Sequence, residues 1–159
     1  MEDERDKKFM LRAIELARQG VDSNLGGPFG AVIVKDGRII GEGCNRVTST
    51  NDPTAHAEIV AIRNACLQLN SFSLEGAAIY TSCEPCPMCL GAIYWARIKK
   101  IFYACTRKDA ASIGFDDDFI YKEINLFPEK RSIKGVNFMR EEAMKVFKMW
   151  EEKPDKIPY

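Results

Sequence analysis

The middle of the sequence places a helix-forming segment between two short apolar runs, and this order constrains the fold more than any other feature. The runs GAAIYTS (76–82) and KIFYACT (100–106) are rich in β-forming residues, which is typical of buried strands. Residues 86–97, between them, predict a helix. A strand, a helix and a strand in succession form a right-handed crossover between parallel strands. The sequence therefore predicts an α/β fold.

Turn residues predict two further elements on the N-terminal side. The segment AVIVKDGRIIGEG (31–43) predicts a β-hairpin, because Asp36-Gly37 separates two β-rich runs. Asp52 and Pro53 predict the N-cap and the first turn of the helix that follows them.

The remaining periodic segments complete the predicted architecture. They are helices over 3–20, 116–124 and 140–152, and a short strand over 136–139. Together the elements predict a three-layer α/β/α sandwich with a mixed, mostly parallel sheet of about five strands. We expect one domain over residues 1–152, followed by the tail KPDKIPY (153–159), in which two prolines oppose regular structure.

Composition is that of a globular protein with reduced cysteines. The 159 residues are 46% hydrophobic and 29% charged, which supports a core without disulfide bonds. The opening MEDERDKKF lacks the apolar stretch of a signal peptide, so a cytoplasmic location is expected. Basic and acidic residues balance at 23 each, which disfavours a nucleic-acid partner. No apolar run is long enough to predict a membrane span.

Three of the six cysteines lie in the segment TSCEPCPMC (81–89), at Cys83, Cys86 and Cys89. A bacterial iron–sulfur motif would need a further cysteine at position 93, which is Ile93. A zinc ribbon would need a second close pair, whereas the other three cysteines are isolated. A thioredoxin-like redox pair remains open, because a strand followed by CPMC at the start of a helix is the setting of such motifs.

The single histidine, His56, adds the interpretation of a metal site. It lies in the first turn of one predicted helix, as Cys86 and Cys89 lie in the first turn of another. Helix N-termini stabilise thiolates, and cysteines three residues apart share one helical face. One histidine and two cysteines leave the fourth position of a tetrahedral zinc ion open, as in catalytic sites. From spacing alone, a core histidine beside an unrelated redox pair stays an alternative.

Longer sequence blocks resemble one superfamily. Residues 56–58 (HAE) and 85–89 (PCPMC) match H-x-E…P-C-x-x-C, the signature of zinc-dependent nucleobase deaminases. Across nearly its whole length the chain resembles the cytidine/deoxycytidylate deaminase superfamily, through the blocks GGPFGAVIV, NDPTAHAE and YTSCEPCPMCLGAIYWAR. The block GFDDDFIYKEI and the terminal Tyr159 are most similar to bacterial guanine deaminases. The resemblance implies a cytidine-deaminase-like fold and the hydrolytic deamination of guanine to xanthine and ammonia.

The resemblance also implies the metal ligands and a proton carrier. His56, Cys86 and Cys89 would bind one zinc ion per chain, which lowers the pKa of a bound water to about 7 and so supplies hydroxide. Glu58 would carry the proton of that water to the ring nitrogen and then to the departing ammonia. Position alone does not predict this role, because residues two apart on a helix point in nearly opposite directions. An exposed glutamate in a first helical turn is the alternative.

A purine pocket is implied in the same way. Asn45 would hydrogen-bond the base, and Phe29 and Trp95 would line a flat apolar slot. Asp117 would contact the purine and assist proton transfer. By local pattern alone, Asn45 equally fits a turn, the two aromatic residues fit a core, and Asp117 fits a helix N-terminus.

The other four cysteines have no implied function. Cys83 matches no metal position of the superfamily, and we expect a small buried residue at a strand end. Cys44, Cys66 and Cys105 lie within apolar patterns and are expected in the core.

The tail 153–159 has two interpretations. Its prolines favour a frayed end, yet it closes on the apolar and aromatic residues Ile157, Pro158 and Tyr159. In bacterial guanine deaminases the C-terminal segment crosses to a partner subunit, and its final tyrosine caps the substrate site. The resemblance therefore implies a homodimer, a swapped tail, and Tyr159 at the purine.

Two other functions remain as alternatives. A tRNA adenosine deaminase, or a deaminase of cytosine or adenine, would use the same zinc chemistry. An anticodon loop would need clustered basic residues, and the tight clusters are RIKK (97–100) and RKD (107–109). A non-catalytic zinc or redox module is the alternative of a different class, although such a module needs no Glu58.

Overall fold

The computed structural model describes residues 4–159, and its internal contacts divide the chain into two compact units. The first unit ends at Asp118, and the second spans Phe119–Tyr159. The first unit contains α1 (Glu4–Asp22), β1 (Gly30–Lys35), β2 (Arg38–Cys44), α2 (Val47–Thr50), α3 (Ala57–Leu69), β3 (Ala78–Cys83), α4 (Pro87–Trp95), β4 (Lys100–Cys105) and α5 (Arg107–Ser112).

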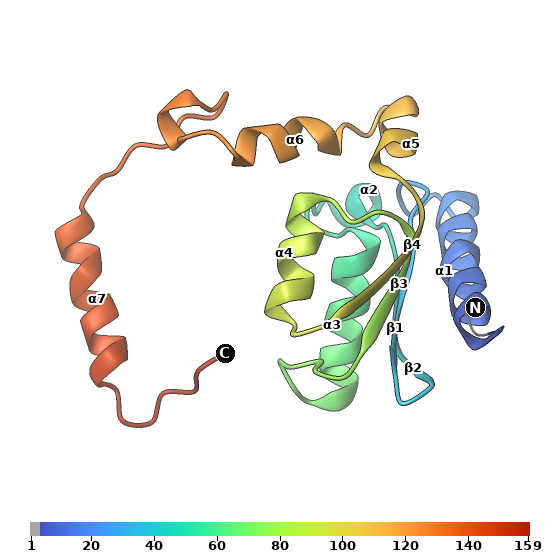
Figure 1. Ribbon diagram of the computed structural model, residues 1–159, viewed down its shortest axis with the longest axis horizontal. Coiled ribbons are helices and arrows are strands. Elements are labelled where there is room, and N and C mark those ends of the chain that lie inside the picture. Colours follow the sequence, from blue (N-terminus) through green and yellow to red (C-terminus); the bar gives the residue numbers. More distant parts are fainter. Residues whose placement is uncertain (1–3) are drawn as a thin grey trace. The chain divides into compact units, whose positions relative to one another are not determined.

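Within residues 4–159 the sheet has four strands in the order β2-β1-β3-β4 (Figure 1). β1 pairs with β2 and with β3 in antiparallel fashion, and β3 pairs with β4 in parallel. The prediction of a mixed sheet is confirmed, with four described strands where about five were expected. The prediction of a parallel majority is wrong, because two of the three described pairings are antiparallel. β2, β3 and β4 do run in one direction, as strands joined by helices should. The hairpin strand β1 lies between β2 and β3, and this central position makes two of the three pairings antiparallel.

The β1–β2 hairpin forms as its turn sequence predicts. Asp36 and Gly37 both adopt positive φ values, 50° and 72°, as a tight hairpin turn of this type requires. The strands on either side pair from Gly30 with Cys44 to Lys35 with Arg38.

Helices cover both faces of the sheet, so the three-layer α/β/α prediction is confirmed (Figure 1). Alternate residues of β1 serve opposite faces, as the two-residue period of a strand requires. Val32 and Val34 pack with Phe9 and Leu16 of α1. The opposite cluster carries strand, α3 and α4 residues, among them Ala31, Ile33, Ile79, Ala61, Ala65 and Ile93.

Two glycines let α3 approach β2 closely, which fixes the start of α3 near the sheet. A Cβ atom at Gly41 would lie 2.4 Å from the carbonyl oxygen of Ala61. A Cβ atom at Gly43 would lie 2.5 Å from the carbonyl oxygen of Ala57. Any larger side chain at either position would push the helix away from the strand.

α3 begins later than the turn signal predicts. Its N-cap is His56, so the prediction that Asp52 and Pro53 start the helix is wrong. Asp52 Oδ1 instead accepts hydrogen bonds from the backbone N–H and the hydroxyl of Thr54, at 2.8 and 2.6 Å. Aspartate makes this local bond in turns as readily as it caps helices. The result is a turn that delivers His56 to the helix N-terminus.

The second unit is helical and carries apolar side chains on its surface. α6 (Asp117–Ile124) starts at the end of the first unit, and a 3₁₀ turn, η1 (Pro128–Lys130), and α7 (Arg140–Glu152) follow. The helix predicted over 140–152 is confirmed, but residues 136–139 do not form the predicted strand. No side chain of α7 is buried. Among residues 4–159, no helix has the length and apolarity needed to cross a membrane.

Candidate active site

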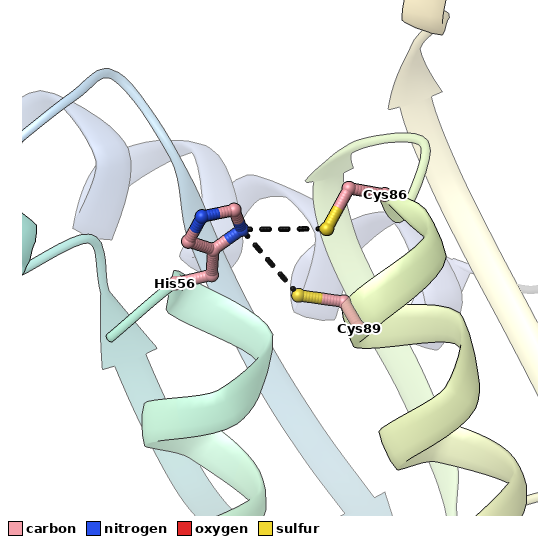
Figure 2. Close-up of side chains that lie close together, drawn as sticks. All are labelled: His56, Cys86 and Cys89. Atoms are coloured by element: carbon pink, nitrogen blue, oxygen red, sulfur yellow. Dashed lines mark hydrogen bonds between the residues drawn. The ribbon is translucent and has the colours of Figure 1, made fainter. Parts of the chain in front are cut away.

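The three predicted metal ligands converge at the N-termini of two neighbouring helices (Figure 2). His56 is the N-cap of α3, Cys86 is the N-cap of α4, and Cys89 lies in the first turn of α4. His56 Nδ1 lies 3.5 Å from Cys86 Sγ and 3.6 Å from Cys89 Sγ. Zinc bonds of ordinary length at tetrahedral angles place nitrogen and sulfur ligands about 3.5 Å apart. The distances from His56 to the two thiols therefore fit a zinc ion, and the three ligand atoms all lie within 4.8 Å of one another.

The pKa values of these three groups are shifted in different directions. A hydrogen bond from Cys89 lowers the pKa of the Cys86 thiol to about 4, with His56 adding to the effect and burial opposing it. The same hydrogen bond and burial raise the pKa of Cys89. The hydrogen bond to Cys86 raises the pKa of His56. A metal ion must displace the remaining protons, so its affinity rises with pH.

Glu58 lies beside the ligands and is almost fully enclosed. Its Oε2 accepts a hydrogen bond from Cys89 Sγ at 3.3 Å, and its Oε1 accepts one from Thr81 Oγ1 at 3.1 Å. The residue is 5% exposed, and burial raises the pKa of its carboxyl. Side chains two residues apart within a helix would point in nearly opposite directions. His56, however, precedes the helix and has extended backbone angles (φ −67°, ψ 156°), so this expectation does not hold for His56 and Glu58.

Thr81 was not predicted as a site residue. It is fully buried in β3, where its hydroxyl also lies 3.0 Å from the carbonyl oxygen of Cys83. A threonine in an apolar strand needs a buried hydrogen-bond partner. A threonine within an apolar run is therefore the feature of the sequence that could have indicated a buried hydrogen bond, which is made here with Glu58.

A cavity of about 460 Å³ opens beside the ligands, within the usual size range of small-molecule sites. It is lined by His56, Cys86 and Glu58, and by the predicted pocket residues Phe29, Asn45 and Asp117. The structure thus brings together six of the predicted site residues around one space.

Asn45 serves the turn and lines the cavity at the same time. Its Oδ1 accepts hydrogen bonds from the backbone N–H groups of Gly27 and Val47, at 3.2 and 3.1 Å. The amide orientation is thereby fixed, with the NH₂ group left to donate to a molecule in the cavity. The two interpretations of this residue are therefore compatible.

An aromatic pair forms the apolar wall of the cavity. Phe29 and Phe115 contact each other edge to face, with ring centroids 4.9 Å apart. Phe115 was not predicted, although it lies in the block GFDDDF that carries Asp117. Burial and the negative charge of Cys86 raise the pKa of the Asp117 carboxyl.

Two predicted pocket residues do not line this cavity. Trp95 ends α4 with 65% of its surface exposed, and Tyr159 belongs to the second unit. Their assignment to the substrate site stays a prediction.

The other four cysteines differ in burial and in their location relative to the cavity. Cys83 lines the cavity but is not among the three convergent ligands, and burial raises the pKa of its thiol to about 12. Cys44 is buried and Cys66 is partly buried, as expected. Cys105 is exposed, so its prediction as a core residue is wrong: it ends β4, which lies at the edge of the sheet.

Known proteins share both the sequence and the fold. Residues 3–105 match the family model of the cytidine and deoxycytidylate deaminase zinc-binding region. The chain is 56% identical to a guanine deaminase of Bacillus subtilis (strain 168) over 151 residues, which cover 95% of this chain and 97% of the relative. It is 42% identical to a tRNA-specific adenosine deaminase of Haemophilus influenzae over 120 residues, which cover 72% and 68%.

A solved structure matches over a similar extent. The crystal structure of guanine deaminase from Bacillus subtilis superposes with a TM-score of 0.93 at 55% identity, covering 96% of this chain and 98% of that one. Because the family model spans well over half of the chain and the matched segment contains the convergent His56, Cys86 and Cys89, this protein belongs to the cytidine and deoxycytidylate deaminase family of zinc-dependent enzymes.

Proposed function

We propose that this enzyme hydrolyses guanine to xanthine and ammonia. The observation that carries the proposal is the match to the Bacillus subtilis guanine deaminase, which extends over nearly all of both chains. The cavity supports it with an apolar wall, a fixed amide and three carboxylates, a set that suits a flat base with several hydrogen-bonding edges.

His56, Cys86 and Cys89 would hold the zinc ion. When bound, zinc would lower the pKa of a coordinated water towards 7 and so supply the attacking hydroxide. The chain's own residues supply the proton transfers and the orientation of the base. We place C2, the ring carbon of guanine that carries the exocyclic amino group, beside these three residues.

Glu58 is the proton carrier in this proposal. Its carboxylate takes a proton from the attacking water, passes it to the adjacent ring nitrogen, and assists departure of the amino group as ammonia. Thr81 holds one carboxylate oxygen at 3.1 Å, which leaves the other oxygen beside Cys89 and the metal position. Water adds at C2, the C2–N bond breaks, and the products are xanthine and ammonia.

Asn45, Phe29 and Asp117 would orient the base. The Asn45 amide donates to a purine acceptor, while Phe29 and the neighbouring Phe115 cover the ring. Asp117 accepts from a purine N–H and assists proton transfer. Trp95 and Tyr159 would complete the slot in the assembled enzyme.

A second candidate is the deamination of adenosine in a tRNA anticodon. The 42% identity to a tRNA-specific adenosine deaminase favours this candidate. The balanced charge of the chain disfavours it, because a polyanionic loop is normally held by an excess of basic side chains.

Substrate comparison separates the candidates. Zinc-loaded enzyme would be incubated with guanine, adenine, cytosine, guanosine and an anticodon stem-loop, and ammonia release would be measured for each. We expect release from guanine, with weaker release from other aminopurines. Release from the RNA alone would exclude guanine as the substrate.

We infer further that the enzyme is a homodimer in which residues 153–159 reach a partner's active site. The second unit supports this assembly, because α7 exposes Val146, Phe147 and Trp150 and has no buried side chain. Exchange of a terminal segment is an economical route to a symmetric dimer. Tyr159 would then cap the purine and exclude water.

A further inference from the structure

The segment between β4 and Asp117 contains a short helix with a firmly bonded start. Thr106 and Asp109 form a capping box at the N-terminus of α5. The backbone N–H of Thr106 donates to Asp109 Oδ2 at 2.7 Å, and the backbone N–H of Asp109 donates to Thr106 Oγ1 at 3.3 Å. Reciprocal bonds of this kind restrain the first turn of a helix.

The other end of α5 is equally restrained and turns the chain back to the cavity. The backbone N–H of Phe115 donates to the carbonyl oxygen of Ala110, and that of Gly114 donates to Ala111, at 3.0 and 3.1 Å. With a φ of 98° at Gly114, these bonds form a Schellman motif. The six-residue helix α5 is therefore restrained at both ends, and the turn that follows it places Phe115 and Asp117 at the cavity.

Glu84 connects α5 to the segment that carries the ligand Cys86. It lies two residues before the ligand Cys86 and lines the cavity. Its backbone N–H donates to the carbonyl oxygen of Cys105 at 2.8 Å. Its Oε2 accepts a hydrogen bond from the backbone N–H of Arg107 at 2.9 Å.

The hydrogen bond from the Arg107 backbone N–H to Glu84 has a specific consequence for α5. Arg107 is the first residue of α5, and the N–H of a first helical residue has no partner within its own helix. Glu84 therefore binds an N–H group that would otherwise need water. Burial and the charge of Cys86 are the main causes of the raised pKa of the Asp117 carboxyl, and Glu84 lies close enough to make a small contribution.

We propose that Glu84 is a positioning residue that holds α5 and thereby fixes where Phe115 and Asp117 face the substrate. The proposal rests on the proposed function in one respect, the contact of Asp117 with guanine. Glu84 acts here as a hydrogen-bond acceptor, and neither its charge nor its contact with the base is required.

Two substitutions of Glu84 test the acceptor role. In the zinc-loaded full chain, Glu84→Ala should lower kcat/KM for guanine by about ten- to a hundredfold, mainly through KM, with zinc content unchanged. Glu84→Gln keeps an acceptor for the Arg107 N–H and should stay within about threefold of wild type. The matched control, Glu75→Ala, removes an exposed glutamate away from the cavity and should change nothing. Wild-type kinetics in Glu84→Ala, or equal damage by Gln and Ala, would overturn the proposal.

Hydrogen exchange gives a readout that needs no turnover. In Glu84→Ala the backbone amides of residues 106–117 should exchange faster, whereas Glu84→Gln and Glu75→Ala should match wild type. Thr106→Ala, which loosens α5 without touching Glu84, should produce the same exchange pattern and a smaller rise in KM. Lowered turnover in Glu84→Ala with unchanged exchange would refute positioning. If Glu84→Ala shows the expected faster exchange but the wild-type protein does not deaminate guanine, the proposed function alone is refuted.

Discussion

The chemistry at Glu58 depends on two neighbours that hold its two oxygens in different surroundings. Thr81 binds one oxygen, and the other lies 3.3 Å from the ligand Cys89. Glu58→Gln preserves size and most contacts but removes the group that exchanges protons. We expect it to keep zinc and the melting temperature while losing guanine turnover by a factor of about 100 or more. Near wild-type turnover in this variant, measured as ammonia release, would contradict the proton-carrier role.

The metal ligands make a second prediction at the residue scale. Replacing Cys86 and Cys89 together by serine leaves His56 as the remaining ligand of the three, and zinc measured by elemental analysis should fall from about one per chain to near zero. Cys105→Ser is the matched control, because this thiol is exposed and outside the ligand group. Full zinc content in the double variant would exclude the assigned ligands.

At the scale of elements, an ion pair fastens α1 to the edge strand β2. Arg12 Nε and Nη2 donate to the two oxygens of Glu42 at 2.8 and 2.7 Å. The hydrogen bonds from Arg12 lower the pKa of the Glu42 carboxyl below its ordinary value of 4.5. A carboxyl whose pKa is lower in the folded protein stabilises the fold above its unfolded pKa, and this contribution disappears as the pH falls through the folded pKa.

Glu42→Gln tests this linkage. At pH 7 the free energy of unfolding in urea should fall by about 1 kcal/mol at most, because both side chains are a third exposed to screening solvent. The difference from wild type should shrink as the pH is lowered below about 4. Glu75→Gln, at an exposed position, is the control. A difference that persists undiminished at low pH would rule out an ionic origin.

The elements that the sequence predicts correctly are those set by local interactions. The hairpin at Asp36-Gly37 follows from turn chemistry, and the helix over 140–152 follows from its apolar period. The central place of β1 was not predictable, because it depends on which strands meet after the chain folds. Phe115 reaches the cavity only through the turn at Gly114, so its role is invisible in the local pattern. The single histidine and the clustered cysteines indicated a metal site, but the choice of Cys86 and Cys89 over Cys83 rested on the match to the H-x-E…P-C-x-x-C signature.

At the scale of the whole molecule, the proposed homodimer rests on the exposed apolar side chains of the second unit. α7 presents Phe147 and Trp150 to solvent, and Ile157 and Tyr159 extend this character into the tail. Within the second unit the tail is tied to α7 by a hydrogen bond between Lys156 and the carbonyl oxygen of Glu151. Exposed apolar side chains favour a protein–protein contact where they form one large patch, which is how we interpret them in the proposed dimer.

Deleting residues 153–159 tests whether the tail serves a partner's active site. We expect the truncated enzyme to keep zinc, since His56, Cys86 and Cys89 all lie in the first unit, and to lose most guanine turnover. Tyr159→Ala should raise KM more than it lowers kcat, while Tyr159→Phe, which keeps the ring, should restore most of the affinity. Mixing the truncated chain with a chain inactivated by Glu58→Gln is the decisive experiment. If each tail completes the neighbouring site, hybrid dimers regain activity, because an intact tail then covers a site with an intact Glu58. A truncated chain that is fully active, or a wild-type enzyme that is active as a monomer in size-exclusion chromatography with light scattering, would show that each chain completes its own site.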